Sequence, residues 1–336
     1  MTDKQIPMFG LTHTIQESEL ILIPAPWHVT ASEATQTSLA PSQLQQISQY
    51  CDLGHEIYPE AYQYGITMLE ENKKIKTLAK NLRKKAEKVI ECFDNKEEQT
   101  TMIKSYIADI NNGSEELNNW IYKTAQPYIE EEKLIGVVGG DHSVSFGLIK
   151  ALSERVETFG VLQIDAHMDL RDAYQGFTYS HASAMRNILQ FSNISRLVQL
   201  GIRDYAPSEV AYAKSQKGRV KTYTDTELKA QLYQGKTWDS LCRKIMNQLP
   251  ENIYISLDID GLNPSLCPNT GTPVPGGFSL EDIVYLLQKI SKSGHKIIGI
   301  DLVEVGGGDH AMLDHKVAVK ALYELCVHMW GSHEEK

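Results

Sequence analysis

Short runs of apolar residues alternate with helical patterns through the second half of the chain. The runs are continuous, as is typical of strands in a parallel sheet that is covered on both faces. A similar run, ended by prolines, lies near the start of the chain. The predicted strands are LILIPAPW at 20–27, LIGVV at 134–138, FGVLQI at 159–164, RLVQLGI at 196–202, NIYISLDI at 252–259 and HKIIGIDLVEV at 295–305. The pattern predicts a three-layer α/β/α protein with a central, mainly parallel sheet.

Helical periodicity dominates the region around residues 68–132. Apolar residues recur every three or four positions in IKTLAKNLRKKAEKVIECF at 75–93, which is the spacing of an amphipathic helix. We expect another helix to open after Asn112-Gly113-Ser114, with Ser114 capping its first turn. No convincing linker divides the chain, so we expect a single domain over residues 1–336 with a helical extension around 68–132. Its simplest role is a solvated layer packed on the sheet, and partner binding is the alternative.

Composition excludes several classes of protein. Of 336 residues, 42% are hydrophobic and 23% are charged, as in ordinary globular proteins. The five cysteines are scattered without a CxxC pair, which argues against a disulfide framework or zinc site and for a reducing cytoplasm. Neither a secretory signal nor a membrane-length apolar run is visible, so we expect no membrane association. A net charge of −10 argues against nucleic-acid binding and favours a cationic small molecule.

Polar clusters follow three of the predicted strands: GGDHS at 139–143, DAHMD at 165–169 and DID at 258–260. In a parallel sheet all three emerge at the carboxyl edge, where open α/β folds bind their ligands. Alternate residues of an extended segment point the same way, so DxHxD and DxD each direct their donors into one pocket. Carboxylates gathered in one site repel one another unless cations balance them. Mixed carboxylate and imidazole donors suit Mn²⁺, Zn²⁺, Fe²⁺ or Ni²⁺, and two such ions generate a hydroxide nucleophile near neutral pH.

Each cluster taken alone has a structural explanation. GGDHS is consistent with a turn in which Asp141 caps the next helix, and DxHxD or DxD with polar loops. Their joint occurrence after three predicted strands favours a metal site over three unrelated turns.

GGDHS, DAHMD and SLDIDGLNPSLCPNTGTPVPGG resemble the three signature motifs of the arginase–agmatinase (ureohydrolase) family, in the family's order, and the similarity covers about residues 134–325. The resemblance implies a three-layer fold, two Mn²⁺ ions per chain with Ni²⁺ as an alternative, and a homo-oligomer, either a trimer or a hexamer. By motif, one metal is held by His142, Asp165, Asp169 and Asp258, and the other by Asp165, His167, Asp258 and Asp260. The family's bridging hydroxide attacks the guanidinium carbon, and Asp169 also orients it.

Two further residues match roles in that family. His181, in YSHAS, corresponds to a histidine at the pocket mouth that shuttles protons and serves the leaving amine. Its structural alternative is a loop histidine bound by backbone groups. Glu304, in DLVEV, resembles the acid that pairs with the substrate guanidinium, a planar donor that a carboxylate meets well. A structural ion pair is the alternative for Glu304.

The sequence departs from the family pattern at two positions. Asn263 stands where many relatives have aspartate, although this residue is not a metal ligand. Arg171 replaces an asparagine with which arginases recognise the amino-acid head group, and it could pair with Asp172 or Asp204 or bind a substrate carboxylate. We therefore expect a small cationic guanidino substrate, and agmatine, cleaved to putrescine and urea, comes first. Guanidine, guanidinobutyrate, arginine, formimidoylglutamate and a non-catalytic family member are the alternatives.

Overall fold

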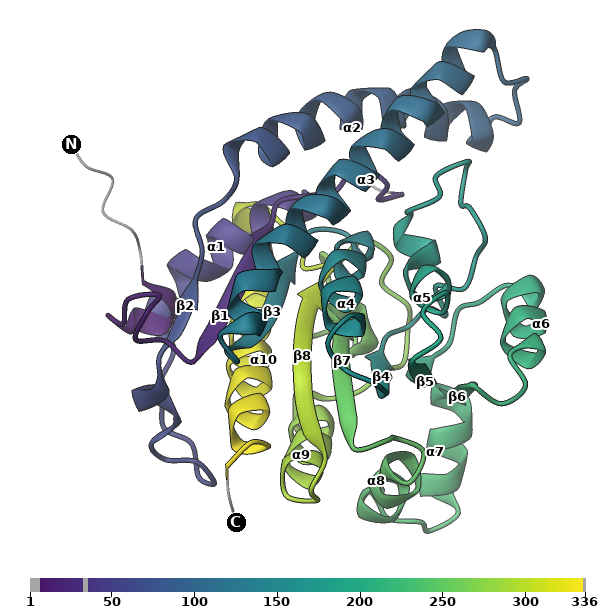
Figure 1. Ribbon diagram of the computed structural model, residues 1–336. Helices are drawn as coiled ribbons and strands as arrows, with labels where there is room; N and C mark the ends of the chain where they lie inside the picture. Colours follow the sequence, from purple (N-terminus) through teal and green to yellow (C-terminus); the bar gives the residue numbers. More distant parts are fainter. Residues whose placement is uncertain (1–6, 33–35, 335–336) are drawn as a thin grey trace.

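The computed structural model of the protein describes residues 7–32 and 36–334. Within them, eight parallel strands form one sheet in the order β2-β1-β3-β8-β7-β4-β5-β6 (Figure 1). The strands are β1 (Leu20–Ala25), β2 (Ile66–Met68), β3 (Leu134–Gly139), β4 (Phe159–Ile164), β5 (Ile194–Ile202), β6 (Val220–Thr224), β7 (Asn252–Asp258) and β8 (Lys296–Val303). The predicted α/β architecture around a parallel sheet is confirmed.

Helices cover both faces of the sheet and bury a separate apolar core on each. Helices α1, α7, α8, α9 and α10 pack on one face, and α2, α3, α4 and α5 pack on the other. None of the described helices combines the length and apolar character needed to cross a bilayer. The helices are α1 (Ala40–Ile47), α2 (Lys73–Asp94), α3 (Thr101–Glu130), α4 (Ser145–Ser153), α5 (Ala184–Ile188), α6 (Pro207–Ser215), α7 (Asp225–Tyr233), α8 (Trp238–Met246), α9 (Leu280–Ser291) and α10 (Met312–Gly331).

The helix expected to begin after residue 114 instead begins at the start of α3. Thr100 caps it, accepting the backbone N–H of Ile103 at 3.3 Å, and the helix continues without a break through Gly113. A Cβ atom at Gly113 would lie 2.1 Å from Leu82 Cδ1 of α2. The glycine therefore permits close packing of α2 against α3, and Ser114 is buried in the helix interior rather than capping a new one.

Candidate metal centre

Four neighbouring strands in the middle of the sheet, β3, β8, β7 and β4, are each followed by residues with expected roles in the site. Because the strands are parallel, their carboxyl ends meet at one edge of the sheet. His142 follows β3, Glu304 follows β8, residues 165–169 follow β4, and Asp258 is the last residue of β7. The structure brings together all six expected metal ligands at this edge: His142, Asp165, His167, Asp169, Asp258 and Asp260.

The turn after β3 delivers His142 to this edge. Gly140 packs so tightly that a Cβ atom there would lie 1.8 Å from the carbonyl oxygen of Trp27. Asp141 caps the short helical turn that begins at His142, and its carboxylate also accepts the backbone N–H of Thr30 at 3.1 Å. The Asp141 carboxylate is thus occupied by structural hydrogen bonds, and the imidazole beside it belongs to the site.

Three carboxylate oxygens converge on one nitrogen of His142. Its Nδ1 lies 2.9 Å from Asp169 Oδ2, 3.1 Å from Asp165 Oδ2 and 3.3 Å from Asp258 Oδ2. The other nitrogen, Nε2, lies 2.8 Å from Ser256 Oγ, whose own proton is donated to a neighbouring carboxylate. This network assigns the proton of a neutral His142 to Nε2, which leaves Nδ1 as a buried lone pair without a hydrogen-bond partner. Because three carboxylates face this nitrogen lone pair, a cation bound between them would stabilise the arrangement.

His167 forms a second group beside the first. Its Nδ1 lies 3.0 Å from Asp260 Oδ2 and 3.6 Å from Asp165 Oδ1. Backbone donors orient both acids: the N–H of His167 donates to Asp165 Oδ1 at 2.6 Å, and the N–H of Ala166 donates to Asp260 Oδ1 at 3.0 Å. Asp165 turns one oxygen toward each histidine, so it is the natural link between the two groups.

The charges of these groups are unbalanced. In the part of the chain that the structure describes, no lysine or arginine forms an ion pair with any of the four aspartates. Burial, followed by the charge of Asp165, raises the pKa of Asp169 to about 7. Burial, together with Asp260 and Asp165, raises the pKa of Asp258 well above its usual value. Burial acts to lower the pKa of His167, but Asp260 and Asp165 raise it to about 12. The metal-free site therefore holds protons that divalent cations would replace.

His181 lies at the mouth of the same cavity. Its backbone N–H donates to Thr30 Oγ1 at 3.0 Å, and its ring nitrogens lie 3.3 Å from Ser32 Oγ and 3.4 Å from Ser180 Oγ. The Tyr174 ring meets the imidazole edge-on, with 5.8 Å between centroids. Burial, followed by the charges of the two metal-site histidines, lowers the pKa of His181 to about 3. The imidazole is therefore neutral near pH 7.

Glu304 is fixed on the opposite wall by its backbone. Its φ is 59°, a left-handed conformation that is uncommon for a glutamate and that clusters at functional sites. The backbone N–H donates to Gly140 O at 2.9 Å, and Oε1 accepts the backbone N–H of His142 at 2.9 Å. Burial, followed by the charge of Asp141, raises the pKa of Glu304 well above its usual value. A cation placed beside this carboxyl would restore its ionised form.

The cavity between these walls has a volume of about 150 Å³, and the sequence did not point to several of its lining residues. Tyr174 and Tyr205 line it from loops, where an aromatic residue gives no signal of its own. Glu209 is buried, and it accepts the backbone N–H of Leu170 at 3.0 Å and that of Ala206 at 2.8 Å. A glutamate in the first turn of a helix is typical of a capping acid, and this local role conceals its place in the pocket.

The two departures from the family pattern have separate structural roles. Arg171 Nε lies 3.9 Å from Glu209 Oε2, and its guanidinium carbon lies 5.0 Å from the centroid of the Tyr174 ring. Asp172 pairs with another arginine at 3.0 Å, so it is not the partner of Arg171 that we considered. Asp204, the other partner considered, lies 4.0 Å from a metal-site histidine instead.

Asn263 stabilises its own loop. Its side-chain oxygen accepts the backbone N–H of Ser265 at 3.0 Å and the hydroxyl of Ser265 at 2.7 Å. Its backbone N–H donates to Phe278 O at 2.8 Å. The asparagine thus supplies the acceptor that this turn requires.

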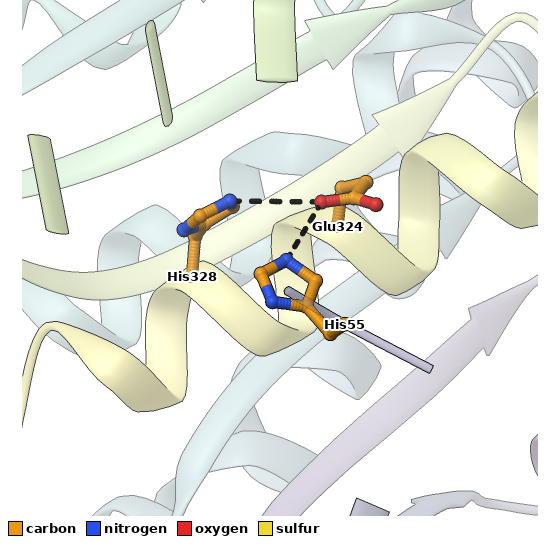
Figure 2. Close-up of side chains that lie close together, drawn as sticks. All are labelled: His55, Glu324 and His328. Atoms are coloured by element: carbon orange, nitrogen blue, oxygen red, sulfur yellow. Dashed lines mark hydrogen bonds and ion pairs between the residues drawn. The ribbon is translucent and has the colours of Figure 1, made fainter. Parts of the chain in front are cut away.

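A further group of potential ligands, His55, Glu324 and His328, lies outside the cavity (Figure 2). Glu324 Oε2 lies 3.1 Å from His55 Nε2 and 3.6 Å from His328 Nε2. His55 Nδ1 accepts the backbone N–H of Tyr58 at 3.0 Å, so the proton of a neutral His55 resides on Nε2 and is donated to Glu324. Lys320 balances this single carboxylate at 2.9 Å. The group therefore ties the loop around residue 55 to α10, and its charges need no metal ion.

Fold and sheet edge together define an α/β protein with candidate divalent-metal ligands at the carboxyl ends of its central parallel strands. Within that class, the chain belongs to the arginase family, which residues 18–327 match.

Individual relatives agree with this assignment. The chain is 34% identical over 217 residues to the N(1)-aminopropylagmatine ureohydrolase of Thermus thermophilus, which covers 62% of this chain and 70% of that protein. It is 32% identical over 197 residues to the proclavaminate amidinohydrolase of Streptomyces clavuligerus, covering 56% of this chain and 60% of that protein. The agmatine ureohydrolase of Thermoplasma volcanium superposes with a TM-score of 0.74 over 98% of this chain and 96% of its own, at 18% identity. That last similarity is one of fold.

Proposed function

We propose that the protein is a binuclear metal hydrolase that cleaves a guanidino compound to urea and an amine. One observation carries the proposal: the buried Nδ1 atom of His142 faces three carboxylate oxygens in a cavity whose wall also holds Glu304. Such a donor set fits divalent cations, and a buried carboxylate beside it suits a planar cationic substrate. Ureohydrolase and amidinohydrolase names among the relatives support the same reaction class.

The nitrogen and oxygen donors suit Mn²⁺, and Ni²⁺ is the alternative because it accepts the same ligands. One ion would be held by His142, Asp165, Asp169 and Asp258, and the other by Asp165, His167, Asp258 and Asp260. When bound, the metal pair supplies a water activated as a nucleophile near neutral pH.

The remaining residues act on the substrate. Glu304 pairs with the guanidinium, whose positive charge offsets the effect of burial and keeps the carboxyl ionised. Asp169 orients the attacking water by hydrogen bonding. His181 lines the cavity, where its imidazole is placed to pass a proton to the leaving amine.

Charges at the cavity mouth favour agmatine as the substrate. Asp204 lines the cavity with a carboxylate that has no lysine or arginine partner among the described residues, and its negative charge attracts the cationic tail of agmatine. Arg171 also lines it, but this guanidinium already lies near Glu209 and against the ring of Tyr174. A substrate carboxylate would have to compete for Arg171 with those neighbours.

A substrate panel tests the proposal. Metal-free protein is loaded separately with Mn²⁺ and Ni²⁺ and assayed with agmatine, arginine, guanidinobutyrate and guanidine for urea, and with formimidoylglutamate for formamide. We expect urea from agmatine at the highest kcat/KM. Formamide from formimidoylglutamate alone, or no product from any compound with either metal, would overturn the assignment.

Arg171→Ala tests the preference for a cationic tail. We expect little change with agmatine, or a gain, because the substitution removes a like charge. A selective loss of activity with guanidinobutyrate, from an enzyme that turns over that compound well, would show that Arg171 binds a carboxylate and that a guanidino acid is the substrate.

We also propose a single domain over residues 1–336, with the helical region 68–132 as its extension, and a cytoplasmic homo-oligomer. Both apolar cores share the same sheet, which supports one cooperative unit.

Burial raises the pKa of the Cys326 thiol, so this group is poorly reactive, as suits a protein without disulfides. Light scattering with an online mass measurement distinguishes a trimer or hexamer from a monomer.

A further inference from the structure

A tight turn at the cavity mouth connects the metal ligands to His181. The backbone N–H of Phe177 donates to Tyr174 O at 2.9 Å and closes the turn. Its two central residues, Gln175 and Gly176, have φ of 52° and 82°. A two-residue turn with positive φ at both centres suits glycine or asparagine, and a glutamine at the first centre is unfavourable. The turn therefore depends on contacts from outside.

The turn places Tyr174 at the cavity mouth, between His181 and Arg171. Its ring meets the imidazole of His181 edge-on at 5.8 Å, and the guanidinium carbon of Arg171 lies 5.0 Å from the ring centroid. His181 has its own hydrogen-bond partners in Thr30 and Ser32, whereas Arg171 has the more distant Glu209 besides the ring. A shift of the turn would therefore move Tyr174 and Arg171, the tail side of the cavity, more than the proton relay.

On helix α3, the side chain of Asn111 hydrogen-bonds to this turn. Its Nδ2 donates to Gly176 O at 3.1 Å, and its Oδ1 accepts the backbone N–H of Thr178 at 2.9 Å. The two partners fix the orientation of the carboxamide, because a carbonyl can only accept and an N–H can only donate. The side-chain amide thus donates one hydrogen bond to the loop backbone and accepts one from it, as the backbone of a neighbouring strand would.

Other contacts hold the turn from both sides. Gln175 Nε2 donates to Asp94 Oδ1 at the end of α2, at 3.3 Å. The side chain of Ile107 lies so near Gly176 that a Cβ atom there would be 3.0 Å from Ile107 Cδ1. On the far side, Asn187 of α5 donates to the carbonyl of Thr178 at 2.9 Å. Figure 1 shows α2 and α3 extending past the sheet, on the side of the loop that precedes α5.

We propose that Asn111 is a positioning residue that sets substrate specificity, and that α2 and α3 serve to fix the tail side of the cavity through it. The kinetic part of this inference rests on the proposed function. The structural part, that Asn111 holds the turn, does not.

The experiment compares Asn111→Ala with Asn112→Ala, a neighbour on the exposed side of α3. Losing these two hydrogen bonds, one part-buried and one exposed, should raise KM for agmatine about tenfold, while kcat, metal content and Tm stay near those of the parent protein. Asn111→Asp keeps the acceptor for the Thr178 N–H but places an oxygen against Gly176 O. The KM of this variant should therefore lie between the KM values of Asn111→Ala and Asn112→Ala. A parent-like KM, or equal losses in kcat, KM and Tm, would overturn the positioning role.

Hydrogen exchange measured on peptides that cover residues 171–181 separates the two proposals, since it needs no substrate. Exchange should accelerate there in Asn111→Ala and remain unchanged in Asn112→Ala. Unchanged exchange in Asn111→Ala would overturn the inference, even in an active enzyme. If no guanidino compound is cleaved, the proposed function fails, and the exchange result still decides whether Asn111 holds the turn.

Discussion

At the scale of single residues, some ionisable groups have hydrogen-bond or ion-pair partners within the protein, and others in the site do not. Asp141 has its hydrogen bonds from backbone donors, and Glu324 has its lysine and histidine. His142 Nδ1 has no hydrogen-bond partner, and among the described residues no lysine or arginine pairs with the acids around it. A buried ionisable group without a partner is costly, so such a set persists where a ligand compensates for it.

Asp258→Ala should abolish turnover and reduce the metal content. The carboxylate of Asp258 would be shared by both ions, and its loss exposes two cations to mutual repulsion. Metal content is measured by elemental analysis after gel filtration. Asp172→Ala, which removes only an exposed ion pair, is the control and should retain both metals. Two tightly bound ions per chain in Asp258→Ala would contradict the ligand assignment.

His181→Asn should slow turnover and leave the metal content intact. General acid–base assistance typically contributes about 10²–10⁴-fold, so kcat should fall within that range. The rate is followed as urea release from neutral to alkaline pH. Parent-like rates across that interval would identify His181 as an ordinary loop residue.

Glu304→Gln should lower kcat/KM by at least about tenfold, because a charge-assisted pair is worth about 1.5–3 kcal/mol. The glutamine keeps the volume and one acceptor but loses the charge. The defect should be similar for every guanidino substrate, since all share that head group. A loss confined to one substrate would place Glu304 at the tail instead.

At the scale of helices and strands, the elements that carry function were predictable and the edges of the fold were not. Strands β1, β3, β4, β5, β7 and β8 are continuous apolar runs, and burial on both faces produces that signal. β2 has three residues, too few for a pattern, and β6 is a half-exposed edge strand. The prediction missed the continuity of α3 because of Gly113. In sequence, a glycine required for close packing on α2 cannot be distinguished from a glycine that ends a helix.

The motifs placed the candidate metal ligands at the strand ends, but Asn111, Tyr174 and Glu209 carried no such signal. Glu209 reaches the cavity through a contact with a segment 39 residues away, and Asn111 contacts the turn that carries Tyr174 from a helix far away in sequence. Periodicity and spacing describe neighbours along the chain, so a side chain that acts on a loop 65 residues away leaves no trace in them.

Gly140→Ala should destabilise the junction between β3 and His142. The new Cβ atom would meet a backbone oxygen, which cannot turn aside as a side chain could, and overpacking of this kind costs about 1–3 kcal/mol or more. We expect a lower Tm and a lower metal content, because His142 moves with the turn. Gly54→Ala is the matched control, since a Cβ atom there meets nothing within 4 Å. Equal Tm values for the two variants would show that the junction accommodates the added Cβ atom without loss of stability.

At the scale of the whole molecule, the site couples stability to pH and metal. Without metal, the folded-state pKa of Asp169 and Asp258 is raised, and so is that of His142 and His167. Through these four groups the native state binds more protons than the unfolded chain between about pH 5 and pH 8, so their contribution to stability falls as pH rises through that window.

Metal ions should reverse this trend. Cations compete with those protons, so binding strengthens as pH rises, and the gain in Tm on adding Mn²⁺ should be larger at pH 8 than at pH 5.5. Thermal unfolding of chelator-treated protein, with and without Mn²⁺, measures both values. An equal gain at the two pH values would indicate that the ion binds without displacing protons.

The order of the sheet also bears on how the chain is made. β8 lies between β3 and β7, although residues 296–303 are synthesised last among the strands. A nascent polypeptide emerging from the ribosome with β3, β4 and β7 complete still has a gap in the middle of its sheet, and His142 stays apart from Asp258. The central strands can close only after β8 has been made, so His142 and Glu304 join the candidate ligands that follow β4 and β7 late in folding. Until then the exposed flanks of β3 and β7 are surfaces that a chaperone would recognise.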